Sequence, residues 1–163
     1  MGPAVAAPAR PGARPRVRDT PCTMSEQPRS PDLAQQARRF AEAFNSGNFD
    51  GAMSRYSPNA VWDATGMGLA IYEGREAIRE YLGEWFGFFQ EPHLSFEEIA
   101  DLGHGIVFTT CLLTGGMKGS SGRLQVRYAT VTEWSDGLAT RVAAYHDSDD
   151  ARTLAERLAA SRA

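Results

Sequence analysis

The 163-residue sequence predicts one α+β domain in which a curved, mostly antiparallel sheet wraps on three N-terminal helices, in the order ααβαββββα with a helix at the C-terminus. Three observations predict it: a long hairpin pattern between Arg123 and Asp147, an amphipathic helix pattern that begins at Asp32, and two strand-like runs at 94–102 and 106–114. Helices and sheets bury their apolar faces against one another in layers, so this order indicates helices laid across a sheet.

The hairpin pattern at 123–147 is the strongest signal in the chain. Ser-Asp-Gly at 135–137 predicts the turn, because glycine tolerates positive φ and aspartate bonds to its own backbone. Side chains alternate along a strand, so one face of the first strand would carry Val126, Tyr128, Thr130, Thr132 and Trp134. This mixture of aromatic and hydroxyl groups is typical of a ligand pocket, although Tyr and Thr are also simply good strand formers. We expect Tyr128, Thr130 and Trp134 to contact a ligand.

The first helix is expected to begin after Asp32, a good N-cap, and to end near Gly47. Its apolar residues recur at helical spacing and form one stripe: Leu33, Ala37, Phe40, Ala41 and Phe44. A short helix is expected at Asp50–Tyr56, a strand at Ala60–Ala64, and a loop or irregular strand at Thr65–Tyr72.

The third helix is expected to open at Glu73–Glu76 and to end at Glu91-Pro92, with an apolar face too wide for a surface helix. That face would carry Ile78, Tyr81, Leu82, Trp85, Phe88 and Phe89. It should lie across the concave sheet as one wall of the interior. Residues 115–122 predict a loose hairpin loop, and Asp150–Ser161 predicts the closing helix.

The charge and composition of the chain exclude some classes of binding partner. The net charge is −3, and residues 1–24 carry four arginines against Asp19, which leaves −6 on the rest of the chain. An acidic domain argues against a nucleic-acid partner, and no window has the roughly 18 apolar residues of a membrane span. Cys22 and Cys111 lie in unrelated contexts without metal-ligand spacing, so we expect reduced thiols, no metal, no cofactor and a cytoplasmic location.

Residues 1–31 are rich in proline and arginine and are expected to be a disordered tail ahead of a domain at 32–160. Two functional interpretations remain open, a basic interaction arm and an organellar transit peptide. The preferred interpretation is that Met24 is the true start of translation.

The run FAEAFNSGNFDGAMSRYSPNAVWD, then YEGREAIREYL, then the Asp-Gly hairpin ending in YHD, resembles the SnoaL-like branch of the nuclear transport factor 2 superfamily. The resemblance covers about residues 33–158. It implies a cone-shaped α+β barrel with a deep, mostly apolar cavity, which is often dimeric through the sheet. It does not imply one function, because this fold hosts isomerases, cyclases, hydrolases and binding proteins.

The catalytic residues of three related enzyme types are mostly missing at the matching positions. The general-base aspartate of ketosteroid isomerases falls on Asp63, but the tyrosine and the acid of their oxyanion hole fall on Phe40 and Thr130. The acid of SnoaL-type polyketide cyclases falls near Ala144. Limonene-epoxide-hydrolase-like enzymes use an Asp–Arg–Asp set. One position of that set also falls on Ala144, and the matching positions on the middle strand are Thr110 and Leu112.

Asp63 and His146 are the candidate catalytic residues. Asp63 is expected to point inward, where burial would raise its pKa and make it a usable general base; the alternative is a structural aspartate in the Asp-Ala-Thr-Gly turn. His146 shares the inward parity of Ala144 and would lie at the cavity mouth; the alternative is a strand-end histidine in solvent or paired with Asp147. Phe40 is expected to contact a ligand.

Three functions follow from these observations. The preferred one is a domain that binds a small hydrophobic metabolite in an apolar pocket. The second is an isomerase, cyclase or epoxide-hydrolase-like enzyme that uses Asp63 as general base, assisted by His146 or Tyr128. The third is an interaction module that dimerises through its sheet. We expect a homodimer in any of these cases, with Arg127 and Arg141 facing outward.

Overall fold

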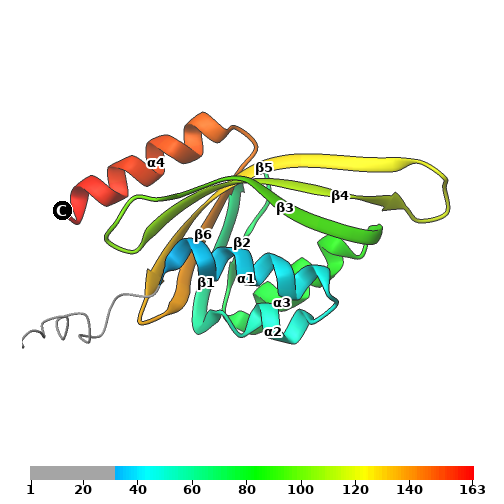
Figure 1. Cartoon of the computed structure of the whole chain (residues 1–163), viewed down its shortest axis with the longest axis horizontal. Helices are drawn as coiled ribbons and strands as arrows, with labels where there is room; N and C mark the ends of the chain where they lie inside the picture. The colour runs from blue at the N-terminus through cyan, green and yellow to red at the C-terminus, as the bar shows by residue number, and fades with distance from the viewer. Residues whose placement is uncertain (1–31) are drawn as a thin grey trace, which may run out of the picture. The chain divides into compact units, whose positions relative to one another are not determined.

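The computed structural model describes residues 32–163, so the expectations about residues 1–31 and about Met24 lie outside the described residues. The described part is an α+β domain (Figure 1). Its elements are α1 (Leu33–Asn45), α2 (Phe49–Met53), β1 (Tyr56–Gly66), β2 (Ile71–Glu73), α3 (Arg75–Phe86), β3 (Phe89–Asp101), β4 (Ile106–Met117), β5 (Arg123–Ser135), β6 (Leu138–Tyr145) and α4 (Ser148–Ser161).

The strands form one open, curved sheet in the order β2-β1-β6-β5-β4-β3. All neighbours are antiparallel except β1 and β6, which run parallel. The predicted hairpin is confirmed as β5 and β6, which pair from Ser135–Leu138 to Ala129–Tyr145. Both turn residues have positive φ, 53° at Asp136 and 80° at Gly137, which matches the right-handed twist of the paired strands.

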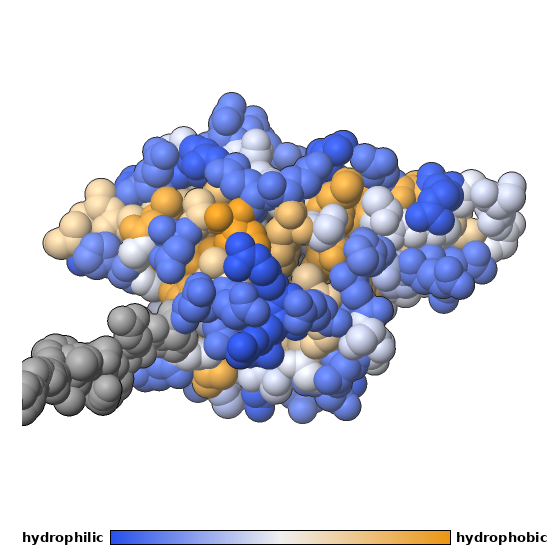
Figure 2. Space-filling model, viewed as in Figure 1, coloured by the Kyte–Doolittle hydropathy of each residue, from blue (hydrophilic) through white to orange (hydrophobic). Residues whose placement is uncertain are grey.

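The two faces of the sheet carry separate cores. Helices α1, α2 and α3 cover the inner, concave face, whereas α4 lies on the opposite face (Figure 1). The inner core gathers the apolar sides of the three helices around Trp62, Leu113 and Tyr128. The outer core lies under α4 around Phe108 and Val131. Figure 2 shows apolar side chains along the line where α1 meets the strands, between hydrophilic outer surfaces.

Helix α1 is fixed at both ends by side chains that the sequence supplies. The Asp32 carboxylate accepts a hydrogen bond from the Gln35 backbone N–H at 3.2 Å. At the other end, the Asn45 amide group donates to the Leu94 carbonyl and accepts from the Leu94 N–H, both at 2.8 Å. Since β3 is an edge strand, Asn45 pairs with backbone groups that no neighbouring strand reaches.

The third helix ends earlier than predicted. It stops at Phe86, the Gly87 N–H bonds to the Gly83 carbonyl, and β3 begins at Phe89 rather than at Leu94. Phe88, predicted on the buried helix face, is therefore exposed, while Phe89 is buried in the sheet. Strand β3 can include Pro92 because it lies at the edge of the sheet, where a missing N–H breaks no ladder.

Strand β4 likewise runs further than predicted, through Gly115 and Gly116 to Met117. A β-carbon on Gly115 would lie 3.0 Å from the Phe89 side chain. Glycine therefore belongs here because the neighbouring strand packs Phe89 against its backbone.

The first strand is also longer than predicted, and a short strand is added beside it. Strand β1 spans eleven residues, with an irregularity in its pairing to β6 between Tyr56 and Val61 that accommodates Pro58. Residues 71–73, within and just after the predicted loop or irregular strand, form β2. None of the helices in residues 32–163 is long and apolar enough to cross a membrane.

Candidate functional site

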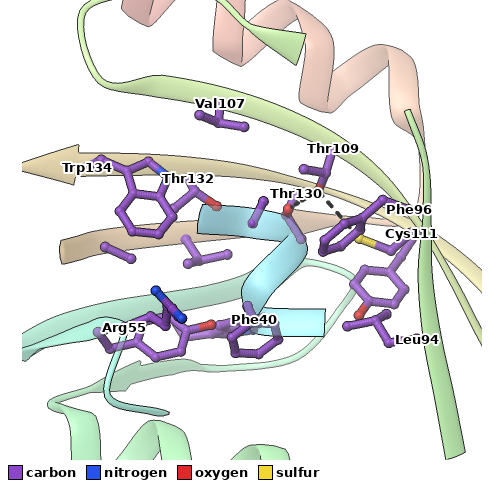
Figure 3. A pocket seen from close by; sticks show the side chains of 16 residues that line it. Phe40, Arg55, Leu94, Phe96, Val107, Thr109, Cys111, Thr130, Thr132 and Trp134 are labelled. Carbon is purple, nitrogen blue, oxygen red and sulfur yellow. Dashed lines mark hydrogen bonds between the residues drawn. The ribbon is translucent and has the colours of Figure 1, made fainter. Parts of the chain in front are cut away.

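A cavity of about 60 Å³ lies between α1 and the inner face of the sheet (Figure 3). Its volume is roughly four to six times the space that one water molecule needs, so it accepts a compact group of a few heavy atoms. A larger ligand requires the lining side chains to move. The lining comprises Ala37, Phe40, Arg55, Tyr56, Trp62, Leu94, Phe96, Val107, Thr109, Cys111, Tyr128, Thr130, Thr132, Trp134, Ala139 and Val142.

A line of polar groups crosses this mainly apolar wall. Thr109 on β4 lies directly opposite Thr130 on β5, and their hydroxyl oxygens are 2.5 Å apart. Thr109 also contacts the Cys111 thiol, with 3.4 Å between oxygen and sulfur. Strand alternation places Thr109 and Cys111 on the same face of β4. The wall therefore offers hydroxyl groups at fixed points among apolar surfaces, which is how small-molecule sites orient a ligand.

The acidic groups of the wall remain protonated at neutral pH. Burial raises the pKa of the Cys111 thiol to about 12, although hydrogen bonds from Thr109 oppose the shift. Burial, reinforced by the nearby Cys111, also raises the pKa of the Tyr56 and Tyr128 hydroxyls above the usual range for tyrosine. These residues are therefore equipped to form hydrogen bonds, and a thiolate or phenolate nucleophile is disfavoured.

Arg55 is the charged residue of the lining. It lies in the connection between α2 and β1, and its backbone is held on both sides: its N–H donates to the Ala52 carbonyl at 3.2 Å, and its carbonyl accepts from Ala139 at 2.8 Å. Its guanidinium Nη1 donates to the Gln36 side chain on α1. In Figure 3 the nitrogen-bearing end of Arg55 lies between the side of the cavity that carries Phe40 and the side that carries Trp134.

The structure places the four residues predicted to contact a ligand, Phe40, Tyr128, Thr130 and Trp134, in the lining of this one cavity. Phe40 packs edge-on against Tyr56, with 5.9 Å between ring centroids. Tyr128, Thr130 and Trp134 share the inner face of β5, as strand alternation predicts. Whether they bind a ligand stays a prediction.

Asp63, by contrast, does not line the cavity, and its predicted inward orientation is wrong. Its neighbour Trp62 points inward and is 6% exposed, so the alternation of β1 turns Asp63 to the outer face. The bulky apolar residue takes the inner position because burying an indole ring stabilises the fold more than burying a carboxylate.

On the outer face, the Asp63 carboxylate is held by other groups. It accepts hydrogen bonds from the Thr65 hydroxyl and N–H at 2.6 and 3.0 Å and forms an ion pair with Arg141 at 2.9 Å. Partial burial alone would raise its pKa, but the Thr65 bonds and Arg141 outweigh it and lower the pKa of Asp63 below its usual value. A general base poised near neutrality requires the opposite shift.

His146 also lies outside the cavity lining. Strand β6 ends one residue earlier, at Tyr145, and the His146 side chain is exposed rather than placed at a cavity mouth. The neighbouring Asp147 does not pair with it: its carboxylate caps α4 by accepting from the Asp149 N–H at 2.8 Å.

Six lining residues with polar or aromatic groups were not predicted from the sequence: Arg55, Tyr56, Trp62, Phe96, Thr109 and Cys111. Thr109 and Cys111 could have been found from the sequence, because strand alternation places them on the same face as the apolar Val107 and Leu113. Arg55 carries no such signal, because it lies in a connection whose course only the packing of α1 and β6 determines.

Solved structures share this fold at low sequence identity. A protein with a ketosteroid isomerase-like fold from Catenulispora acidiphila, in complex with trimethylamine, matches with a TM-score of 0.60 and 15% identity over 78% of this chain and 95% of that chain. TerC, co-crystallised with polyporic acid, matches with a TM-score of 0.61 and 19% identity over 78% and 99%. A protein described as a putative SnoaL-like polyketide cyclase, from Jannaschia sp. CCS1, matches with a TM-score of 0.60 and 20% identity over 73% of this chain and 90% of that chain.

A comparison with curated protein sequences finds no relative of this chain. The model of the SnoaL-like domain family matches residues 37–142, which include most of α1, all of the first five strands and most of β6. That stretch carries every residue of the cavity wall and covers more than half of the sequence. The chain therefore belongs to the SnoaL-like domain family.

Proposed function

We propose that this domain binds a small, largely apolar organic molecule in the cavity between α1 and the sheet. The observation that carries the proposal is the cavity itself, an apolar enclosure crossed by the Thr109–Thr130 hydroxyl pair and bordered by one guanidinium group. Such an enclosure removes apolar ligand surface from water, while its few polar groups fix the ligand's orientation. Phe40, Tyr128, Thr130 and Trp134 are the proposed contacts.

Two solved structures of the same fold support a small-molecule ligand, since one holds trimethylamine and the other was co-crystallised with polyporic acid. The size of the cavity supports a compact ligand or a compact part of a larger one. The proposal assigns no proton transfer to Asp63, whose carboxylate is bound to Thr65 and Arg141 on the other face of the sheet.

The test uses the intrinsic fluorescence of the protein. Two of its three tryptophans, Trp62 and Trp134, line the cavity, so an occupant should change their emission. We expect titration with compact aromatic probes such as benzyl alcohol, benzamide and benzoate to produce a saturable change and to raise the melting temperature, because a ligand that binds the native state stabilises it.

A variant that fills the cavity provides the control. Ala37→Leu adds three carbon atoms at the α1 wall and should abolish the response to every probe, whereas Ala160→Leu, exposed on α4, should leave it unchanged. The proposal is wrong if no probe gives a saturable response, or if Ala37→Leu folds and binds as the wild type does.

We also propose that the chain forms a homodimer through the outer face of its sheet. Helix α4 covers only the part of this face around Phe108 and Val131. Further along β4, Leu112 lies half-buried on the same face and does not belong to the core under α4. Sedimentation velocity should show twice the chain mass for the wild type and a monomer for Leu112→Asp; a wild-type monomer at micromolar concentration would exclude the dimer.

A further inference from the structure

Arg55 lies at the cavity without a carboxylate partner among the described residues. Five arginines have a carboxylate partner in the part of the chain that the structure describes: Arg79 with Asp50, Arg127 with Glu97, Arg141 with Asp63, Arg152 with Glu98 and Arg162 with Glu133. Arg55 has no such ion pair within residues 32–163, and the cavity lining contains no Asp or Glu. The cavity therefore has a positive charge at its border and no protein group there that neutralises it.

Arg55 also has an unused hydrogen-bond donor. Its Nε is buried and has no acceptor among the described residues, although Nη1 donates to Gln36. A buried donor without an acceptor loses its hydration and gains nothing in return, which is why such groups are uncommon in folded proteins. A donor of this kind at a cavity wall is ready to bind an acceptor supplied by a ligand.

The guanidinium is held in place before any ligand arrives. The Arg55 backbone is bonded to α2 through Ala52 and to β6 through Ala139, and its side chain is bonded to α1 through Gln36. Three elements therefore restrict its position, so binding loses little side-chain entropy. A planar guanidinium presents its donors as a fork that matches the two oxygens of a carboxylate.

The other polar groups of the wall do not favour a cationic ligand. Tyr56, Tyr128 and Cys111 stay protonated and neutral, and the Thr109 and Thr130 hydroxyls already bond to each other. The indole nitrogen of Trp134 is a further buried donor without an acceptor among the described residues. The lining contains no Asp or Glu, and its formal charge is positive.

We propose that the cavity selects a ligand that carries an anionic oxygen group, a carboxylate or its equivalent, on a compact apolar body, and that Arg55 binds this group. The proposal rests on the proposed function of the cavity and adds the chemical class of its ligand. The apolar body contacts the apolar side chains of the lining, and the anionic group lies at Arg55.

The test compares benzoate with benzamide, which have nearly the same shape but differ in charge. In the native full chain, monitored by tryptophan fluorescence, benzoate should bind at least about tenfold more tightly, because hydrogen bonds to charged groups are the stronger kind. Raising the NaCl concentration should weaken benzoate binding and leave benzamide binding unchanged. Benzylamine, a cation at neutral pH, should bind more weakly than either.

The variants assign the preference to Arg55. Arg55→Met keeps an apolar stem and should reduce the benzoate preference to about one, and Arg55→Lys should keep part of it because the charge remains without the fork. Arg38→Met, which removes an exposed arginine of α1 outside the lining, should retain the full preference. If Arg55→Met does not fold, the benzoate–benzamide and salt comparisons in the native chain still test whether the cavity prefers an anionic ligand.

The outcomes separate this proposal from the proposed function. Equal binding of benzoate and benzamide, both abolished by Ala37→Leu, would overturn the anion preference and leave the apolar binding site intact. A benzoate preference that persists in a folded Arg55→Met would overturn the role of Arg55. A benzoate preference that is unchanged in Ala37→Leu would show that benzoate binds outside the cavity. Failure of every probe to bind would overturn both proposals.

Discussion

The Asp63 carboxylate and the Arg141 guanidinium form an ion pair at 2.9 Å on the face of the sheet opposite the cavity. The pair joins β1 to β6, the two strands that run parallel. Arg141 also lies 3.9 Å from Glu133 on β5, and Glu133 bonds to Arg162, which caps the end of α4. Charges of alternating sign therefore connect three strands with the C-terminal helix, and Asp63 serves as a structural residue at one end.

The first prediction concerns the pH dependence of this pair. Because the folded state lowers the pKa of Asp63, the carboxylate contributes stability above its unfolded pKa of about 3.9, and this contribution is lost as the pH falls through the lower folded value. Asp63→Asn should therefore reduce the free energy of unfolding by about 1 kcal/mol at pH 7 and by much less at pH 3. Urea denaturation at the two pH values measures the difference.

A matched control for Asp63→Asn is Glu80→Gln, which removes an exposed acid of α3 that has no ion pair among the described residues. It should change the unfolding free energy by less than about 0.5 kcal/mol at both pH values. A destabilisation by Asp63→Asn that grows as the pH falls would contradict the sign of the pKa shift.

The second prediction concerns the amide of Asn45. It supplies both a donor and an acceptor to the Leu94 backbone on the edge strand β3. Asn45→Ala should reduce the free energy of unfolding by about 1–2 kcal/mol, the sum expected for two hydrogen bonds that water partly replaces. Asn45→Asp keeps one acceptor but turns a carboxylate oxygen toward the Leu94 carbonyl, so it should cost at least as much. Amide hydrogen exchange at Leu94 should accelerate in the alanine variant, and unchanged exchange would show that the bond does not protect β3.

The third prediction concerns the buried hydroxyl pair in the cavity wall. Replacing Thr109 or Thr130 alone by valine leaves the other hydroxyl without its partner and should cost about 1–3 kcal/mol. Replacing both removes the unsatisfied group, so the double variant should be less destabilised than the sum of the single variants. Thermal unfolding of the four proteins gives the coupling energy, and a value of zero would mean that the two hydroxyls do not depend on each other.

The fourth prediction concerns the Cys111 thiol, which is 2% exposed and whose pKa burial raises to about 12. A thiol-specific disulfide reagent attacks the thiolate, so native Cys111 should not react at pH 8. In Cys22→Ser, where Cys111 is the remaining cysteine, one thiol should react after unfolding in guanidinium chloride and none before. Stoichiometric reaction of the folded variant within minutes would show that the cavity opens readily.

The sequence predicted the fold well because its main signals are local. Asp136 and Gly137 determine the hairpin by their positive φ values, and Asp32 and Gly47 mark the two ends of α1. The end of α3 was not predicted, because Phe88 and Phe89 continue the apolar spacing of a helix. Only the packing of Phe89 against Gly115 shows that it belongs to a strand.

The candidate site was predicted in part. The alternation of β5 placed Tyr128, Thr130 and Trp134 on one face, and the cavity lies on that face. For β1 the same alternation separated Trp62 from Asp63 but did not state which of them faces inward, and the matching position in ketosteroid isomerases favoured Asp63. Arg55 was not found, because its place at the cavity depends on contacts with α1 and β6 that are distant in sequence.

The two faces of the sheet carry separate sets of side chains. The residues of the cavity wall point inward, whereas Phe108 and Val131 pack outward under α4, and that outer core shares no side chain with the cavity. A substitution on the inner face can therefore change which molecule fits while the core under α4 continues to support the strands. A chain built in this way can acquire new specificities in small steps without losing its capacity to fold.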